Sequence, residues 1–152
     1  MSLRMKLFLR AIPAALVTWA LIVDFLVPES RWFEVERVQV YDTIEGISPK
    51  MVVSRKVNRP FRGHWIVTVK KAENALSDSG YYANCVASGE SDYREETKLP
   101  PPDKLNLNWW TYPRDCDLKA GTYIVSTSWT FDGFFKTRTV TANSNFFVVK
   151  AQ

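Results

Sequence analysis

The sequence is poor in the residues from which most enzyme sites are built. Its 152 residues include one histidine, two cysteines and six glycines. One chain therefore cannot supply the usual zinc site of cysteine and histidine ligands. Its few glycines form no phosphate-binding loop, and no cluster of metal ligands stands out. We expect no catalytic residues, no metal, no cofactor and no small-molecule substrate.

Two hydrolytic mechanisms can still be considered. A Ser-His-Asp triad would depend on His64, the single histidine, which follows Gly63 at an expected strand start and is interpreted as a surface or turn residue. A serine–lysine membrane peptidase needs no histidine, and Ser48 with Lys70 or Lys71 has a partial likeness to its catalytic pair. The sequence context that activates the serine in such enzymes is absent, so this class is kept only as an alternative.

Apolar residues, in contrast, are plentiful. The chain is 46% hydrophobic and 14% aromatic, with a net charge of +4. Such a composition can fill a core, which excludes a disordered chain. The length fits one globular domain.

The N-terminal segment has the pattern of a membrane anchor. An apolar run from Ala11 to Val27 follows three basic residues, and with 7–9 included it reaches about 21 residues, roughly enough for an α-helix to cross a bilayer. No small residues that would permit cleavage follow the run. The pattern predicts a single-pass signal anchor within residues 1–30, with a cytoplasmic N-terminus, and a periplasmic or extracellular domain over 31–152. A cleaved signal peptide and a surface-lying or soluble helix are the alternatives.

Some residues of this segment are candidates for helix contacts within the lipid bilayer. Small residues four apart, which permit close helix packing, and one acidic residue make up this set: Ala11, Ala14, Ala15, Thr18 and Asp24. The carboxylate of Asp24 is interpreted either as reaching the membrane interface or as contacting a neighbouring helix or subunit.

The remainder of the chain has the pattern of β-structure. Runs rich in Val, Ile, Thr and aromatic residues alternate with turn residues. The expected strands lie near 33–41, 51–57, 64–70, 80–88, 105–111, 121–131, 134–141 and 145–150. In the clearest strand we expect one inward face, formed by Tyr123, Val125, Thr127, Trp129 and Phe131. Asp132-Gly133 then predicts a two-residue type I′ hairpin.

A tyrosine follows a leucine and a glycine at the start of that long strand, in Leu118-Lys119-Ala120-Gly121-Thr122-Tyr123. This arrangement resembles the tyrosine corner of immunoglobulin-like and fibronectin-III-like domains, and Trp65 lies where such domains often keep a core tryptophan. The resemblance implies an all-β fold, an antiparallel immunoglobulin-like β-sandwich after the N-terminal transmembrane helix. It also implies that Tyr123 is buried and that its hydroxyl bonds backbone near Leu118 to Ala120.

A set of short elements lies along the chain in this order: Arg59-Pro60-Phe61, Trp65 to Val69, Cys85, Leu99-Pro100, Leu107-Asn108-Trp109-Trp110, Cys116, Gly121-Thr122-Tyr123 and Ser144-Asn145-Phe146. Their order resembles that of small uncharacterised proteins encoded by bacteriophages and prophages of proteobacteria. The resemblance implies a phage-encoded membrane or virion-associated protein and assigns no chemistry to it.

Cys85 and Cys116 are the only cysteines. Their spacing is not that of a redox-active C-x-x-C pair. A disulfide between them would close a loop of about 30 residues and stabilise the fold by roughly 3–4 kcal/mol. We predict this structural disulfide, with free buried thiols as the alternative.

Charged residues gather in two stretches. Residues 50–71 carry seven basic side chains and no acidic one: Lys50, Arg55, Lys56, Arg59, Arg62, Lys70 and Lys71. These are interpreted as solvated strand faces or as a contact for anionic lipid or an acidic partner. Nucleic acid is disfavoured. An acidic stretch over 90–96 has the irregular spacing of a solvated loop and not that of a calcium loop.

Aromatic and arginine side chains near strand ends form a candidate interaction patch: Trp110, Tyr112, Phe134, Phe135, Arg114 and Arg138. This composition is typical of protein contacts, although the four aromatic residues could equally complete the core. We therefore expect a non-enzymatic, membrane-anchored accessory or interaction subunit that contacts other proteins of a membrane or viral assembly. A tethered protein- or glycan-binding module is the alternative.

Overall fold

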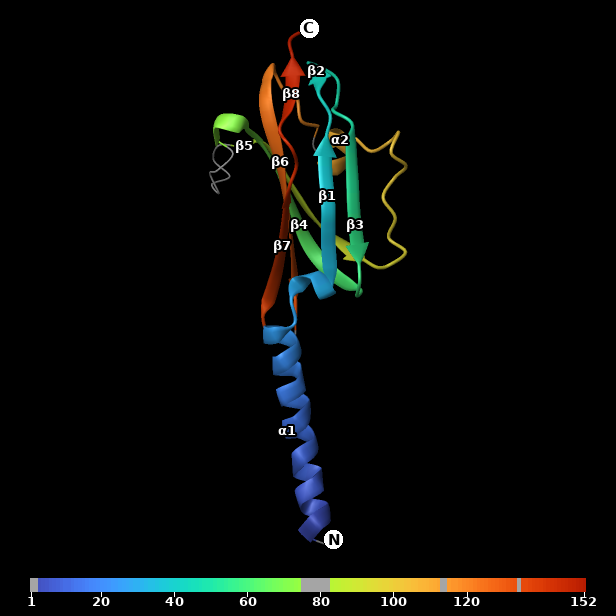
Figure 1. Ribbon diagram of the computed structural model, residues 1–152, viewed down its shortest axis with the longest axis vertical. Coiled ribbons are helices and arrows are strands. Elements are labelled where there is room, and N and C mark those ends of the chain that lie inside the picture. The colour runs from blue at the N-terminus through green and yellow to red at the C-terminus, as the bar shows by residue number, and fades with distance from the viewer. Residues whose placement is uncertain (1–2, 75–82, 113–114, 134) are drawn as a thin grey trace.

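The computed structural model describes residues 3–74, 83–112, 115–133 and 135–152, with the side chains of the first helix described from Ile12 onward. A long N-terminal helix projects from a domain built mainly of β-strands (Figure 1). The elements in chain order are α1 (Leu3–Leu26), η1 (Glu29–Arg31), β1 (Phe33–Val40), β2 (Thr43–Ile44), β3 (Met51–Val57), β4 (Phe61–Lys71), η2 (Ala72–Asn74), β5 (Ala83–Tyr93), α2 (Leu107–Trp110), β6 (Gly121–Asp132), β7 (Thr137–Asn143) and β8 (Phe147–Lys150).

The prediction of a membrane anchor is wrong for this structure. Within the part of the chain that is described, no helix is both long enough and apolar enough to span a membrane. The uncharged run from Ala11 to Val23 extends only about 20 Å as an α-helix, against a hydrocarbon core of about 30 Å. The carboxylate of Asp24, which ends this run, is fully buried against the β domain. The single-pass topology and the location assigned to residues 31–152 are corrected accordingly.

The strands form two sheets of unequal size. β1 and β3 make an antiparallel pair, and the other six strands form a sheet in the order β2-β8-β6-β4-β5, with β7 also paired to β6. β8 and β7 follow one another along the same edge of β6, opposite Gly121–Tyr123 and Ser126–Asp132 respectively. β2 and β8 are parallel. The predicted antiparallel immunoglobulin-like sandwich with a transmembrane helix is therefore corrected to a small and a large sheet preceded in the chain by a helix that is not long and apolar enough to span a membrane.

Strand β6 is the spine of the large sheet, because it pairs with β4 on one side and with β7 and β8 on the other. Its side chains alternate as the sequence predicts. The inward residues are all buried: Tyr123, Val125, Thr127, Trp129 and Phe131. The residues between them are only half-buried, because they face away from the core.

The core between the two sheets is aromatic. Phe33 of the small sheet contacts Trp129 of the large sheet edge-to-face, with ring centroids 5.1 Å apart. Phe61 stacks on Tyr93 at 4.8 Å and also contacts Phe33 at 5.5 Å. Edge-to-face and offset pairs of this kind are the favoured arrangements of aromatic rings. They hold the two sheets together where no backbone hydrogen bonds join them.

One expected strand, 105–111, is a helical turn instead. The side chain of Asn106 accepts a hydrogen bond from the Trp109 N–H at 2.9 Å, which caps the N-terminus of α2. Helical spacing buries Leu107 and Trp110 together and leaves Trp109 exposed. The pattern that suggested a strand is therefore also compatible with a helix, because Leu107 and Trp110 lie three residues apart and face the same side of α2.

The β6–β7 hairpin also differs from its prediction. Asp132 pairs with Thr137, so four residues rather than two connect the strands. The Gly133 N–H donates to the Lys136 carbonyl at 2.8 Å, which closes the loop. The carboxylate of Asp24 lies inside this wider loop and accepts a hydrogen bond from the Lys136 N–H. Other predicted strand ends also shift: β5 and β7 begin and finish later than expected, and β2 was not predicted.

The two cysteines form a disulfide, as the sequence predicts. Cys85 on β5 is bonded to Cys116, with the α-carbons 5.7 Å apart. The bond ties the long connection between β5 and β6 to the edge of the large sheet.

The tyrosine corner is confirmed. Tyr123 is 1% exposed, and its hydroxyl donates to the Lys119 carbonyl at 2.8 Å. Burial is the main cause that raises the pKa of Tyr123, and the nearby charge of Glu45 adds to it. The ring therefore anchors the start of β6 in neutral form.

Replacing the corner tyrosine tests this hydrogen bond. We expect Tyr123→Phe to lower the free energy of unfolding by about 1 kcal/mol, because the Lys119 carbonyl loses its donor while the ring still packs. Tyr41→Phe, which alters an exposed ring, is the control and should change little. Chemical denaturation measures both. Equal effects of the two substitutions would show that the corner bond contributes nothing.

Removing the disulfide tests its role in stability. The cysteines are separated by 31 positions, and opening a loop of that size should cost roughly 2–4 kcal/mol. We expect the double variant Cys85→Ser, Cys116→Ser to melt several degrees below the wild type. A reducing agent should lower the melting temperature of the wild type and leave the variant unchanged. Free thiols are titrated in parallel, because an unchanged melting temperature is informative only if the disulfide has been reduced. A wild type that is fully reduced and still melts at its original temperature would contradict the prediction.

Candidate functional site

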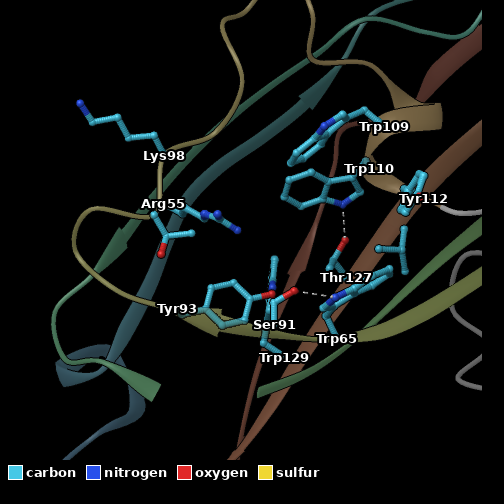
Figure 2. A pocket seen from close by; sticks show the side chains of 12 residues that line it. Arg55, Trp65, Ser91, Tyr93, Lys98, Trp109, Trp110, Tyr112, Thr127 and Trp129 are labelled. Carbon is cyan, nitrogen blue, oxygen red and sulfur yellow. Dashed lines mark hydrogen bonds between the residues drawn. The ribbon is translucent and has the colours of Figure 1, made fainter. Parts of the chain in front are cut away.

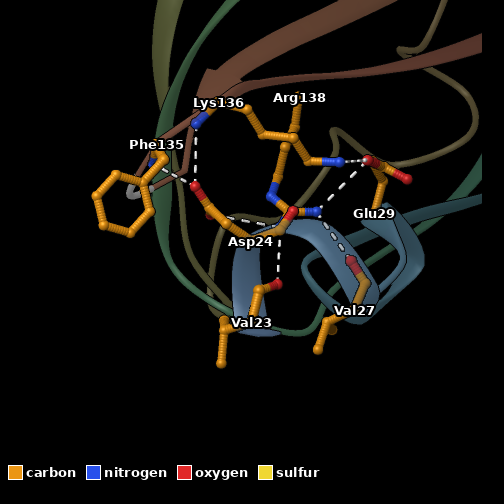
Figure 3. A network of polar contacts seen from close by, with 7 residues as sticks. All are labelled: Val23, Asp24, Val27, Glu29, Phe135, Lys136 and Arg138. Atoms are coloured by element: carbon orange, nitrogen blue, oxygen red, sulfur yellow. Dashed lines mark hydrogen bonds and ion pairs between the residues drawn. The ribbon is translucent and has the colours of Figure 1, made fainter. Parts of the chain in front are cut away.

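The first feature of interest is the joint between α1 and the β domain, where Arg138 of β7 caps the end of the helix (Figure 3). Its guanidinium donates to the carbonyl oxygens of Val23, Asp24 and Val27 at 2.9, 2.6 and 3.0 Å. The last carbonyls of a helix have no donor of their own, and the helix dipole favours a cation there. Arg138 is 1% exposed and also lies over the ring of Trp32 at 4.1 Å.

Asp24 completes this contact from the helix side. One carboxylate oxygen lies 3.4 Å from the Arg138 guanidinium, and the other accepts hydrogen bonds from the N–H groups of Phe135 and Lys136, the latter at 3.0 Å. A β-carbon at Gly133 would lie 2.3 Å from the carboxylate, so only glycine permits this approach. Asp24 therefore contacts the β6–β7 hairpin of the same chain. This contact corrects its interpretation as an acid at a membrane interface.

Glu29, just after the helix, forms the rim of the joint. Its carboxylate lies 3.4 Å from Arg138 and 3.6 Å from Lys136. A backbone hydrogen bond is the main cause that lowers the pKa of Glu29, and the two cations add to it. We call the set Asp24, Glu29, Lys136 and Arg138 the helix joint.

The other candidate contacts on α1 are solvent-facing. Ala14, Ala15 and Thr18 are exposed, and the Thr18 hydroxyl donates to the Ala14 carbonyl at 2.9 Å. The side chain of Ala11 lies outside the described residues.

The predicted interaction patch does not form one surface. Tyr112 and Phe135 are exposed, at 73% and 56%, whereas Trp110 and Arg138 are buried. Trp110 and Tyr112 line a pocket, while Arg138 belongs to the helix joint and the Phe135 N–H donates to the Asp24 carboxylate there. Phe134 and Arg114 lie outside the described residues. The linear sequence could not separate these two groups, because only folding places Trp110 and Tyr112 beside the pocket and Phe135 and Arg138 at the end of α1.

The second feature is a pocket of about 520 Å³, which we call the aromatic pocket (Figure 2). It was missed by the sequence analysis, although the adjacent tryptophans 109 and 110 were a signal. The pocket is lined by Arg55, Trp65, Val67, Ser91, Tyr93, Thr97, Lys98, Trp109, Trp110, Tyr112, Thr127 and Trp129. A pocket of a few hundred Å³ with this many aromatic side chains is typical of a small-ligand site.

Two aromatic walls bound the pocket. Trp109 and Trp110 of α2 form one wall, and Tyr93 and Trp65 of β5 and β4 form the other (Figure 2). Trp110 contacts buried Trp129 edge-to-face at 6.2 Å, which ties the first wall to β6. The walls are therefore carried by the core of the domain and not by loose loops.

Two of the three indole N–H donors of the walls are already used. The Trp65 indole N–H donates to the Ser91 hydroxyl at 3.2 Å, and the Trp110 indole N–H donates to the Thr127 hydroxyl at 2.9 Å. Gly89 lets the Trp65 ring lie across β5, since a β-carbon there would come within 2.7 Å of it. Trp65 and Trp110 thus offer ring surfaces rather than indole donors to a ligand.

Arg55 supplies the charge of the pocket. Its guanidinium lies 5.3 Å from the centre of the Tyr93 ring, and its Nε has no hydrogen-bond partner among the described residues. Burial is the main cause that lowers the pKa of Arg55, and burial also raises the pKa of Tyr93. In the described part of the chain no carboxylate forms an ion pair with Arg55.

The remaining basic residues have separate environments. Arg62 pairs with Glu90 at 2.8 Å across β4 and β5, so the basic and acidic stretches meet within one chain. Arg59 lies over Trp32, and Lys70 is buried on β4.

The residues considered for hydrolysis lie on different elements. His64 is exposed on β4 opposite Glu90. The Ser48 hydroxyl accepts the Asn108 N–H at 3.0 Å, beside α2. Across the ranges that the structure describes, no three metal-ligating side chains gather into a possible metal site.

Comparisons with protein-family models, curated proteins and solved structures gave no match to this chain. The resemblance to phage proteins stays a prediction. Function must therefore be argued from the helix joint, the surface of α1 and the aromatic pocket.

The helix joint can be tested by removing its cation. We expect Arg138→Met to lower the free energy of unfolding by about 3 kcal/mol or more, because it leaves the carboxylate of Asp24 buried without its cation. Amide hydrogen exchange near the end of α1 should rise as well. Lys136→Met is the matched control and should cost less than about 1 kcal/mol, since its ion pair is partly exposed. A similar loss in both variants would contradict the special role of Arg138.

Proposed function

We propose that this protein is a non-catalytic interaction subunit of a larger protein assembly and that α1 joins it to the other subunits. The observation that carries the proposal is the apolar surface of α1. Large apolar side chains of this helix are exposed: Ile12, Leu16, Val17, Leu21, Ile22, Phe25 and Leu26. Contiguous exposed apolar surface marks an interaction site.

These side chains surround the helix. At 100° per residue, Leu16, Leu21 and Ile22 point in three different directions. A helix that is apolar on all sides is normally buried within a larger structure. We infer that the apolar surfaces of other protein subunits cover α1 and pack on several of its sides. The small residues Ala14 and Ala15 would permit a close approach.

The helix joint makes α1 suitable for this task. Arg138 and Asp24 bond the end of the helix to the β6–β7 hairpin, so α1 projects in one direction from the β domain (Figure 1). A subunit whose helix is held in this way also holds its β domain in a defined place in the assembly. The far end of the helix has no acidic residue in its first turn. Because basic residues stand there in the sequence, acidic groups on the partner would offset their unfavourable placement.

Polar substitutions on α1 test the proposal. We expect Leu16→Gln with Ile22→Gln to dissociate the assembly while the β domain keeps its melting temperature, because both side chains are exposed on the helix and absent from the core. The mass of the complex, isolated from the cells that make the protein, is measured by light scattering and native mass spectrometry.

The control carries Ile47→Gln with Phe146→Gln, which replaces exposed apolar residues of the β domain. This variant should remain in the assembly. A wild type that is monomeric, or that is recovered with lipid vesicles instead of protein subunits, would overturn the proposal. Retention of the α1 variant in the complex would overturn it too.

A further inference from the structure

We propose that the aromatic pocket binds a flat apolar ring that carries a carboxylate group. This binding site is additional to the assembly role of α1, because every residue of the pocket belongs to the β domain. Two properties of the pocket lead to the proposal: its facing aromatic walls and the charge of Arg55.

The walls select the ring. Trp109 and Trp110 face Tyr93 and Trp65 across the pocket (Figure 2). Aromatic rings favour offset and edge-to-face contacts with other rings. Because the indole N–H groups of Trp65 and Trp110 are bonded to protein hydroxyls, a strongly hydrated ligand would find few free donors there. A flat apolar group satisfies these walls best.

Arg55 selects the carboxylate. Its guanidinium points toward the pocket, and its Nε has no hydrogen-bond partner in the described structure (Figure 2). Arginine stays protonated in proteins, so a charge that is mostly removed from water lies there without an anion. A bound carboxylate would supply the missing counter-charge to the end of the guanidinium that faces the pocket, and a charge-assisted hydrogen bond of this type is among the stronger ones.

The opposite charge is excluded by the same residues. An aromatic cage on its own favours cationic ligands. Here the guanidinium of Arg55 points toward the pocket, so a cation would be repelled (Figure 2). The pocket differs from a cation cage for this reason, although its walls are similar.

The pocket volume of about 520 Å³ has room for an indole- or phenyl-sized acid with a short linker. The same chemistry could come from a free aromatic acid or from the C-terminal aromatic residue of a polypeptide. Both present a ring a few bonds away from a carboxylate.

The test compares a matched pair of probes that differ only in charge, N-acetyltryptophan and N-acetyltryptophanamide. Binding to the full-length chain is followed by NMR titration at neutral pH, where the carboxylate is ionised. We expect the acid to bind at least tenfold more tightly than the amide. Equal affinities, or no binding of either probe, would overturn the proposal.

Variants separate the two determinants. Arg55→Gln should reduce the tenfold preference for the acid to threefold or less. Trp109→Ala should weaken the binding of both probes and leave the preference for the acid unchanged. Arg62→Gln is the control, because this exposed arginine of β4 lies outside the pocket and pairs with Glu90. Since the preference is a ratio within one protein, partial loss of folded protein does not alter it. An unchanged preference in Arg55→Gln would overturn the assignment of this residue.

A second pair of probes distinguishes the source of the ligand. Indole-3-acetate represents a free aromatic acid, and a hexapeptide ending in tryptophan, with a free or an amidated C-terminus, represents a polypeptide end. Tighter binding of indole-3-acetate supports the free acid, and tighter binding of the free-ended peptide supports the polypeptide. Preferential binding of a neutral saccharide over both acids would overturn the proposal.

Discussion

The buried guanidinium of Arg138 is the contact on which the arrangement of this protein depends. A cation without water needs acceptors, and the end of α1 supplies carbonyl oxygens and the carboxylate of Asp24. The helix end has the complementary need, because its last carbonyls lack donors. The guanidinium therefore supplies donors to the carbonyl oxygens at the helix end, and these polar contacts join α1 to the β domain together with the buried side chain of Val23.

Strand β6 connects this joint to the aromatic pocket. Its inward residues Thr127 and Trp129 support the pocket, and its last residue, Asp132, leads into the hairpin that holds Asp24. The exposed helix and the pocket are therefore carried on one rigid strand with two different surfaces. The proposed assembly element and the proposed binding site therefore share a small domain without sharing residues.

Local sequence patterns predicted the structure correctly where one face of an element is buried. The inward set of β6, the corner bond of Tyr123 and the Cys85–Cys116 disulfide were predicted and observed. The pattern failed at 105–111, because Leu107 and Trp110 can be buried with either strand or helix spacing and the cap from Asn106 favours the helix. It failed for the membrane anchor because hydropathy does not reveal that Asp24 is bonded to the protein's own hairpin.

Sequence alone determined the strand-rich class of the fold, since alternation of apolar and polar residues is a local property of the chain. Only the tertiary structure decided which distant residues meet. Asp24 and Arg138 stand at opposite ends of the sequence, and Arg55, Tyr93 and Trp109 come from three separate segments. Their roles arise from their burial and from the partners that folding brings to them. The residues adjacent to each of them in the sequence determine neither its burial nor its partners.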